Sequence, residues 1–358
     1  FHILSDLISF KKNQKVKSIL ILRNNGIGDL ICITPLFKML NIQFPDAKIM
    51  VGIGNWHENI LDGNPYIDGV IRINAPWHNQ FVSPLNKRHA LSYILSSDEV
   101  KKLIRHSFDV GLDVVGSKWG SLLFLRCGIP KRIGVKGYAG GHTACHASIN
   151  FNSNCHITKA ALKMGEKLGC DKLAEPKPEI FLTPYEYRDS ELKWKIKKSH
   201  GRVIIAPEGS FEEKCWGKQN FNMLIEMIIE KTNFHIIKIG SCSENTIPQT
   251  PHTNERNISY FENLSGTFDL RQSSGIVATC DVVICNSSVA MHMAGAFDKP
   301  CIVLLGKWYD SAELHATQWG HKNTIVLGRE IDKSIEILPS PEIVFNQLIK
   351  IFSTQFRT

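Results

Sequence analysis

The sequence predicts an α/β protein of two Rossmann-like domains, with parallel sheets that face a central cleft. Two observations predict this fold. Short, nearly continuous apolar runs alternate with helical patterns in both halves of the chain, as in parallel sheets covered by helices on both faces. A stretch rich in proline, LAEPKPEIFLTPYEY at 173–187, separates the halves. The 358 residues also correspond to about two domains.

The same patterns locate the individual elements. In the first half, strands are expected at 17–22, 47–53, 68–73, 108–114 and 131–135, and helices near 29–43, 55–62 and 117–127. In the second half, strands are expected at 202–207, 234–240, 280–286 and 300–306, and helices near 218–231, 269–279 and 288–297. We therefore expect an N-terminal domain at 1–178 and a C-terminal domain at 179–340. A last helix at 341–358, with Ser340 as N-cap, is free to pack back on the N-terminal domain.

Charge and cysteine content limit the classes of function. Lys and Arg number 42 and Asp and Glu 34, so the net charge is +8. This excess favours anionic partners such as phosphates, nucleotides or acidic membranes. The positive charges are scattered, which argues against a nucleic-acid surface. The ten cysteines include no CxxC pair and suit free thiols in a reducing cytoplasm.

The opening segment FHILSDLISF has an apolar helical face but lacks the basic start of a signal peptide. We expect a helix packed on its own domain, and the alternative is an anchor at a membrane surface. No apolar run in the chain reaches the ~18 residues of a spanning helix.

The first chemical motif is a glycine turn that carries an acid, RNNGIGDLICITP. Gly26 and Gly28 allow a tight turn between a strand and a helix. A dinucleotide fingerprint would need a third glycine at position 31, which is Ile31. Asp29 stands at the helix start, where an ionised carboxylate is suited to act as a general base. The alternative is that Asp29 only caps the helix.

The second motif is the polar loop in RVIIAPEGSFEEKCWGKQNF. Gly209 and Ser210 follow a strand at the end where ligands bind in parallel sheets. Their backbone N–H groups suit phosphate oxygens, and Lys214 offers a positive charge to a diphosphate. The alternative is a charged loop that merely faces water.

The third motif is the strand-to-helix turn in CDVVICNSSVAMHMAGAF. Ser287 and Ser288 open a helix, and its first N–H groups, near Ser288 and Val289, form an anion site. His292 lies one turn further on the same face as Ser288, so a hydroxyl and an imidazole could reach one phosphate. The alternative is a core histidine bonded to a backbone carbonyl.

These motifs, in this order, resemble the ADP-heptose:lipopolysaccharide heptosyltransferases, family nine of the glycosyltransferases. The resemblance covers roughly residues 17–306. It also includes NPYIDGVIRI, FDVGLDVVGSKWGSLLFLRCGIPKRIGV, HITKAALKMGEKLG and NLSGTFDLRQSSGIVATCDVVICNSS. It implies a GT-B fold, in which the first domain binds the acceptor and the second binds the nucleotide-sugar.

The resemblance also implies roles for single residues. Asp29 matches the catalytic base of an inverting displacement, and Lys214 matches the lysine that holds the diphosphate. Further matches are the phosphate-loop positions Gly209 and Ser210, and the helix start that faces the nucleotide, Ser288, Val289 and His292. Two positions depart from the family, because Ser287 replaces its sugar-binding Asp and Val289 its glycine. The implied donor is an ADP-linked sugar, and no metal or other cofactor is obligatory.

A metal site is an alternative for one further segment. GGHTACHASINFNSNCH contains His142, Cys145, His146, Cys155 and His156, from which four zinc ligands could be drawn. Their spacing fits no standard pattern, and a glycine-hinged loop that contacts the acceptor is the simpler interpretation.

The leading hypothesis is therefore an inverting glycosyltransferase that moves a sugar, expected to be heptose, to a lipopolysaccharide core or related glycan. The glycan is lipid-linked or protein-linked, and nucleic acid is not expected as a partner. The expected location is the cytoplasm, with peripheral contact to the anionic inner face of a bacterial inner membrane as an option. Two alternatives stay open: a non-catalytic protein that binds a sugar-nucleotide or glycan, and a nucleotide-dependent epimerase or dehydrogenase.

Overall fold

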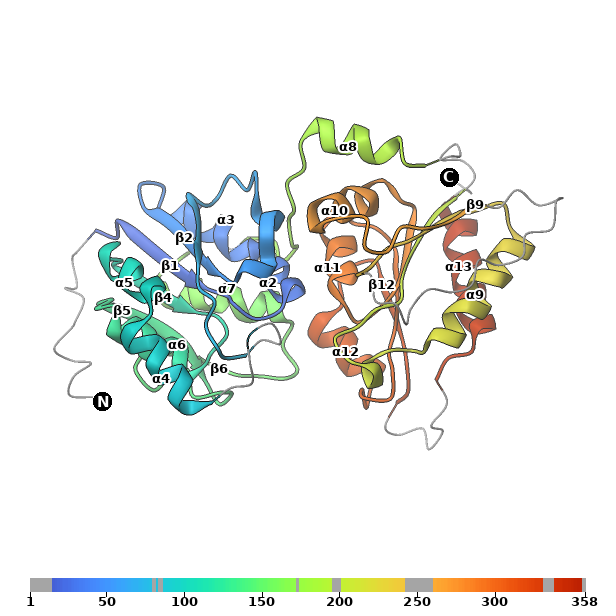
Figure 1. The fold of residues 1–358 in the computed structure, drawn as a ribbon. Coiled ribbons are helices and arrows are strands. Elements are labelled where there is room, and N and C mark those ends of the chain that lie inside the picture. Colours follow the sequence, from blue (N-terminus) through green and yellow to red (C-terminus); the bar gives the residue numbers. More distant parts are fainter. Residues whose placement is uncertain are drawn as a thin grey trace. The chain divides into compact units, whose positions relative to one another are not determined.

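The chain consists of two compact α/β units, Phe1–Pro178 and Glu179–Thr358. The computed structural model describes residues 15–78, 82, 86–171, 174–194, 201–241, 260–330 and 338–355. Each unit contains a six-stranded parallel sheet with helices packed on it (Figure 1). The division falls between residues 178 and 179, which is where the sequence patterns place the domain boundary. The opening segment at 1–10 lies outside the described residues.

The N-terminal sheet has the strand order β3-β2-β1-β4-β5-β6. Its strands are β1 (Ser18–Leu22), β2 (Lys48–Ile53), β3 (Gly69–Arg72), β4 (Val110–Asp113), β5 (Lys131–Lys136) and β6 (Ala147–Asn150). The order reverses at β1, which pairs with both β2 and β4. Ligands of such sheets bind beyond the carboxyl ends of the strands at this reversal. The glycine turn after Leu22 lies there.

Helices and one 3-10 segment connect these strands. They are α2 (Ile27–Cys32), α3 (Thr34–Gln43), η1 (Asn55–Leu61), α4 (Lys87–Ser96), α5 (Asp98–Arg105), α6 (Lys118–Arg126) and α7 (Ile157–Leu168). The single helix expected near 29–43 is divided into α2 and α3 at Ile33. Pro35 has no N–H to donate to the carbonyl of Ile31, and the Thr34 hydroxyl donates to that carbonyl instead, at 2.9 Å.

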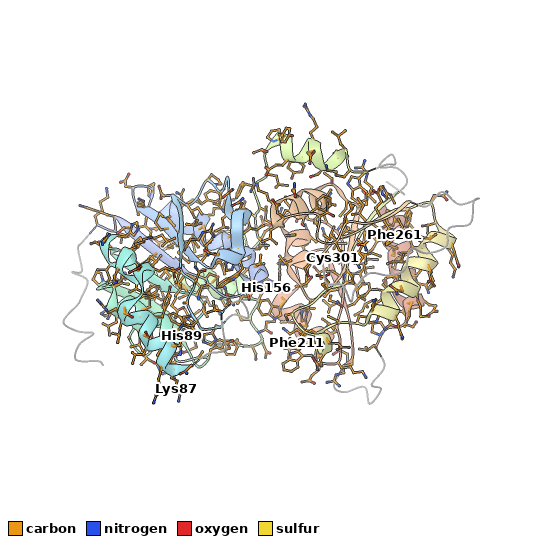
Figure 2. The ribbon with its side chains drawn as sticks, in the orientation of Figure 1. Lys87, His89, His156, Phe211, Phe261 and Cys301 are labelled. Carbon is orange, nitrogen blue, oxygen red and sulfur yellow. The ribbon has the colours of Figure 1, made fainter. Side chains whose placement is uncertain are left out.

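The C-terminal sheet repeats this topology, with the order β12-β11-β10-β7-β8-β9. Its strands are β7 (Arg202–Ala206), β8 (His235–Lys238), β9 (Tyr260–Asn263), β10 (Val282–Asn286), β11 (Cys301–Leu304) and β12 (Thr324–Leu327). The order reverses between β7 and β10, so the loops that follow these two strands share one edge. Cys301, labelled in Figure 2, is buried beside Cys285, and each cysteine in the described part of the chain is a free thiol.

The helices of this unit are α8 (Pro184–Glu191), α9 (Lys218–Lys231), α10 (Leu270–Thr279), α11 (Val289–Ala296), α12 (Ala312–Trp319) and α13 (Pro341–Gln355), with a 3-10 turn η3 (Glu212–Lys214). Within the described residues, every helix is too short or too polar to cross a lipid bilayer.

The helix α13 is part of the C-terminal core. Its apolar side chains Val344, Phe345, Leu348 and Phe352 pack in one cluster with residues of β7 and α9. The Ser340 hydroxyl accepts a hydrogen bond from the N–H of Ile343, as expected for an N-cap. The apolar face of α13 is therefore buried inside the C-terminal unit.

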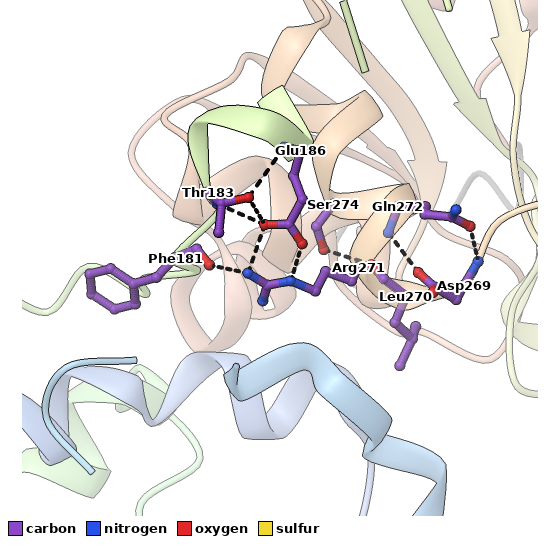
Figure 3. A network of polar contacts seen from close by, with 8 residues as sticks. All are labelled: Phe181, Thr183, Glu186, Asp269, Leu270, Arg271, Gln272 and Ser274. Carbon is purple, nitrogen blue, oxygen red and sulfur yellow. Dashed lines mark hydrogen bonds and ion pairs between the residues drawn. The ribbon is translucent and has the colours of Figure 1, made fainter. Parts of the chain in front are cut away.

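The helix α8 corrects one expectation, because it begins inside the stretch at 173–187 that the sequence predicts to be a linker and extends beyond it to Glu191. Thr183 caps the helix, Pro184 is its first residue, and the Glu186 carboxylate completes a capping box. Arg271 on α10 binds both oxygens of Glu186 and donates to the carbonyl of Phe181 at 2.7 Å (Figure 3). These charged hydrogen bonds fix α8 to α10, so the chain is already structured at Thr183.

Truncation of α13 side chains tests whether this helix belongs to the C-terminal core. We expect Leu348→Ala to lower the free energy of unfolding by about 2–5 kcal/mol, because a fully buried leucine is lost. Ile343→Ala, at a half-exposed site on the same helix, is the matched control and should cost less than about 1 kcal/mol. Urea unfolding monitored by circular dichroism measures both, and equal costs would contradict the assignment.

The Glu186–Arg271 pair predicts a pH effect on stability. The hydrogen bond from Arg271 holds the pKa of Glu186 at about 2, below its ordinary 4.5. A lowered folded-state pKa stabilises the fold above about pH 4.5, and this contribution disappears as the pH falls toward 2. Glu186→Gln retains the capping box but not the charge, and should destabilise the fold by about 1 kcal/mol at pH 7.

Thermal unfolding of both proteins between pH 7 and pH 2.5 measures this effect. The stability difference between wild type and Glu186→Gln should shrink as the pH falls. Glu226→Gln, at an exposed position on α9, controls for the loss of a surface charge. A difference that stays constant over this range would contradict the assignment.

Candidate functional site

The carboxylate of Asp29 is held by two side chains from the preceding turn. Its Oδ1 accepts a hydrogen bond from Nη2 of Arg23, and its Oδ2 accepts one from Nδ2 of Asn25, both at 2.9 Å. The N-cap of α2 is Gly26, with Asp29 in the first turn, so the structure does not use Asp29 as the cap. The carboxylate keeps 22% of its surface exposed and is accessible to a ligand.

The turn itself is fixed from several sides. The guanidinium of Arg23 is 4% exposed, and its Nη1 donates to the carbonyl of Val114 at 2.8 Å. The carbonyl of Asn25 accepts a hydrogen bond from the indole of Trp56 at 2.8 Å. A Cβ atom at position 26 would lie 2.6 Å from Oδ2 of Asp29, so any larger residue there would displace this carboxylate. The backbone thus approaches the carboxylate closely, and Arg23 supplies a buried positive charge beside it.

His57 adds a neutral group near the same turn. Its Nδ1 accepts a hydrogen bond from the N–H of Gly54 at 3.2 Å. Burial lowers the pKa of His57 to about 4, so the ring is uncharged at neutral pH. The positive charge next to Asp29 therefore comes from Arg23.

In the C-terminal unit, one asparagine joins the second and third motifs. Asn286 ends β10, and its Oδ1 accepts a hydrogen bond from the N–H of Trp216 at 3.0 Å. Its Nδ2 donates to the carbonyl of Pro207 at 2.5 Å. The polar loop 207–216 is therefore attached at both ends to the strand that leads into α11.

The loop after β11 completes this edge of the sheet. The N–H of Gly306 donates to the carbonyl of Lys214 at 3.1 Å, and that of Trp308 donates to Glu213 at 2.9 Å. A Cβ atom at position 306 would lie 2.4 Å from the carbonyl oxygen of Cys215, so only glycine permits this approach. The Nζ of Lys214 lies 4.9 Å from the ring centre of Phe211, a residue labelled in Figure 2, and 5.9 Å from that of Tyr309.

The remaining predicted donor residues lie on the same loops or on α11. Gly209 is half-buried and Ser210 exposed in the loop after β7. Ser288 is the N-cap of α11, which begins at the half-buried Val289. His292 is buried, and its Nδ1 lies 3.0 Å from Nε2 of His321. Within this unit, His292 is thus paired with another imidazole.

Ser287 has partners that the sequence motifs do not show. Its Oγ lies 2.8 Å from Nε2 of His315 on α12. Tyr309 packs edge-on against His315, with ring centres 4.9 Å apart, and its hydroxyl interacts with Ser287. Burial, with the charge of Lys214, lowers the pKa of His315 to about 4. The two side chains that interact with Ser287, His315 and Tyr309, are therefore uncharged at neutral pH.

The segment proposed as an alternative metal site contacts other groups. Both ring nitrogens of His146 contact Arg132. The backbone N–H of Arg132 donates to Nδ1 of His146 at 3.4 Å, and Nη2 of Arg132 lies 3.3 Å from Nε2 of His146. Cys145 donates to the carbonyl of Gly141, and His156, labelled in Figure 2, caps α7. Among the described residues, no three of these side chains bring their ligand atoms within 4.8 Å of one another.

Several residues of the site were missed in the sequence. Arg23 and Asn25 lie within the glycine-turn motif RNNGIGD. The position of Arg23, six residues before Asp29, was the sequence feature that could have indicated this ion pair. His315 and Tyr309 lie 28 and 22 residues after Ser287, outside any motif. No local pattern indicates that these two side chains approach it.

Both units thus have the doubly wound parallel sheet of GT-B glycosyltransferases, with polar side chains at the switch-point edges. Residues 99–337 match glycosyltransferase family 9 (heptosyltransferase), and the chain belongs to this family. It is therefore a glycosyltransferase. The matched region contains the loops around Lys214 and Ser287 but begins after Asp29.

Comparisons with individual proteins agree with this assignment. The chain is 23% identical over 297 residues to lipooligosaccharide heptosyltransferase 2 of Haemophilus ducreyi, covering 79% of this chain and 80% of that protein. Two solved structures share the fold. The first is ADP-heptose LPS heptosyltransferase II of Escherichia coli, with a TM-score of 0.70 and 17% sequence identity, and the match covers 94% of this chain and 99% of that chain. The second is a family 9 glycosyltransferase of Veillonella parvula, with a TM-score of 0.72 and 16% sequence identity, and the match covers 95% of this chain and 98% of that chain.

Removal of the Asn286 amide should loosen the joined loops. We expect Asn286→Ala to lower the free energy of unfolding by about 2–4 kcal/mol, because it leaves the N–H of Trp216 and the carbonyl of Pro207 without their partner. Asn323→Ala removes an exposed amide that donates to Asp298 and should cost less than about 1 kcal/mol. Chemical denaturation of both variants provides the comparison, and a cost for Asn286→Ala no larger than the control would refute the joining role.

Proposed function

We propose that this glycosyltransferase transfers heptose, with inversion, from ADP-heptose to a lipopolysaccharide core or a related glycan. The observation that carries the proposal is the geometry of Asp29, whose partly exposed carboxylate is fixed by Arg23 and Asn25. Both contacts are charge-assisted hydrogen bonds, which favour the ionised form that a general base requires.

The reaction follows from one base and one good leaving group. A hydroxyl oxygen of the acceptor attacks the anomeric carbon while its proton passes to the carboxylate of Asp29. The bond between the anomeric carbon and the diphosphate oxygen breaks, and its electron pair leaves with ADP. A single displacement from the opposite face inverts the configuration at the anomeric carbon.

The C-terminal unit is the proposed donor side. Lys214 supplies a positive charge to the leaving diphosphate, and the backbone of Gly209 and Ser210 and the start of α11 supply N–H donors. Ser287, Ser288, Val289 and His292 complete this set. The adenosine diphosphate and heptose parts of the donor are supported by the name of the structurally similar Escherichia coli enzyme. In this scheme no metal or other cofactor is required.

The N-terminal unit is the proposed acceptor side, with Gly26 and Gly28 shaping the turn that carries the base. The names of the relatives support a lipopolysaccharide-type acceptor. We place the reaction in the cytoplasm, with peripheral contact between the enzyme and the anionic inner face of a bacterial inner membrane. The net charge of +8 and the free thiols support this location.

A second candidate function is binding of a sugar-nucleotide without transfer. The replacements at Ser287 and Val289 favour it, because a carboxylate is a stronger acceptor for sugar hydroxyls than a serine is. The retained Asp29, with both oxygens positioned, favours transfer.

Replacement of Asp29 tests the proposed base. Asp29→Asn should reduce kcat by about 100- to 10,000-fold, because the amide cannot accept the hydroxyl proton. Release of ADP from ADP-heptose in the presence of a lipopolysaccharide core acceptor measures turnover. Asp98→Asn, which removes an exposed carboxylate at the start of α5, should leave kcat unchanged.

Two results would contradict the proposal. Full turnover by Asp29→Asn would exclude this carboxylate as the base. Tight donor binding by the wild-type protein, with no turnover on any core acceptor, would favour the binding function instead.

A further inference from the structure

The polar cluster around Ser287 points to a contact that the family resemblance does not supply. The cluster consists of Ser287, Tyr309 and His315, and it lies at the edge that also carries Lys214. The resemblance places a sugar-binding carboxylate at position 287. A carboxylate only accepts hydrogen bonds, whereas each of these three side chains has a proton to donate.

The protonation of His315 sets the direction of the hydrogen bonds. The ring is 4% exposed and uncharged at neutral pH, so it carries one proton. Its Nδ1 is buried and has no hydrogen-bond partner within the described residues. A proton on Nδ1 would be a buried donor without an acceptor, which proteins avoid more strictly than a bare acceptor. The proton therefore resides on Nε2, and His315 donates to Oγ of Ser287.

The hydroxyl proton of Ser287 is then available to Tyr309. Burial raises the pKa of Tyr309, and the hydrogen bond from Ser287 opposes this rise, as expected when the serine donates and the phenol oxygen accepts. The phenol stays protonated at neutral pH, so its own proton points away from Ser287. The three side chains thus form a relay of donors, from His315 through Ser287 to Tyr309.

The end of this relay suits an anion. The Nζ of Lys214 lies 5.9 Å from the ring centre of Tyr309, so a cation and a phenol O–H share the edge. The phosphate oxygens of a nucleoside diphosphate accept hydrogen bonds and carry negative charge, whereas a sugar hydroxyl needs acceptors as well as donors. Ser287 already uses its proton and one lone pair inside the cluster.

We propose that the donor relay His315–Ser287–Tyr309 binds the terminal phosphate of the nucleoside diphosphate, with His315 as the positioning residue. This inference rests on the proposed function for the presence of a nucleotide-sugar donor, and it assigns position 287 to the diphosphate rather than to the sugar. Tyr309 makes the contact through its hydroxyl proton, because the proton of Ser287 is already donated to the phenol oxygen. His315 acts through Ser287, whose hydroxyl it orients.

Calorimetric titration of the full chain with ADP and with AMP tests the relay. AMP lacks the terminal phosphate, so the ratio of the affinities for ADP and AMP measures the contribution of this phosphate to binding. Tyr309→Phe should reduce the preference for ADP by about 10-fold or more, since its hydrogen bond to a charged group is lost. Ser287→Ala should reduce the preference similarly, because the phenol loses the partner that orients its hydroxyl. The affinity for AMP should stay within about 2-fold.

Two substitutions of His315 separate positioning from packing. His315→Gln keeps an N–H donor for Ser287 and should retain the preference for ADP to within about 3-fold. His315→Phe fills the space without a donor and should lose the preference as Ser287→Ala does. Tyr185→Phe removes a phenol hydroxyl at an exposed site on α8 and is the matched control, with no change expected.

The outcomes distinguish this inference from the proposed function. The same pairs are measured for UDP with UMP and GDP with GMP, because the terminal phosphate is common to all three. If the substitutions reduce the preference for the diphosphate only with UDP or only with GDP, the result would support the relay and contradict an ADP-linked donor. If the substitutions reduce the preference for the diphosphate but the wild-type protein transfers no sugar, the result would support the relay and contradict the proposed glycosyl transfer. An unchanged preference in Tyr309→Phe and Ser287→Ala, or no preference for any diphosphate in the wild type, would overturn the relay.

Discussion

The proposed donor side of this protein depends on the two hydrogen bonds of the Asn286 side chain. A parallel sheet brings the ends of β7 and β10 to one edge, but it leaves the loops beyond them without a defined position. The side-chain amide of Asn286 fixes the position of the loop after β7, since its oxygen accepts a hydrogen bond from the N–H of Trp216 and its nitrogen donates one to the carbonyl of Pro207. Lys214, the serines before α11 and the loop at Gly306 are arranged around this connection. In the N-terminal unit, the turn after β1 is held by a charged side chain instead, because Arg23 bonds both the carbonyl of Val114 and the carboxylate of Asp29.

The central strands and the switch-point motifs could be predicted from the sequence. Strands such as β1 and β10 are buried along almost their whole length, and continuous apolar runs are typical of that environment. Gly26 and Ser288 stand where a strand gives way to a helix, so their neighbours fall at the ligand-binding edge. Elements at the sheet edges are harder to predict. The strands β6 and β12 have only four residues each and are mostly half-exposed, and no long apolar run marks them.

Other features depend on contacts between distant parts of the chain. The pair of Ser287 and His315 joins residues 28 positions apart, and no local spacing encodes it. The helix α8 does have a local signal, since Thr183, Pro184 and Glu186 form a capping box, but the prolines around it favour a linker. The assignment of α13 to the C-terminal core required knowledge of which surface its apolar residues meet.

The central claim is a single displacement at the anomeric carbon with Asp29 as the only base. The most direct test is the anomeric configuration of the product, measured by NMR after transfer from ADP-heptose of known configuration to a core acceptor. The account predicts a product with the opposite configuration to the donor. A product that retains the configuration of the donor would require a second displacement or a different mechanism, and would contradict the assignment of one base to the reaction.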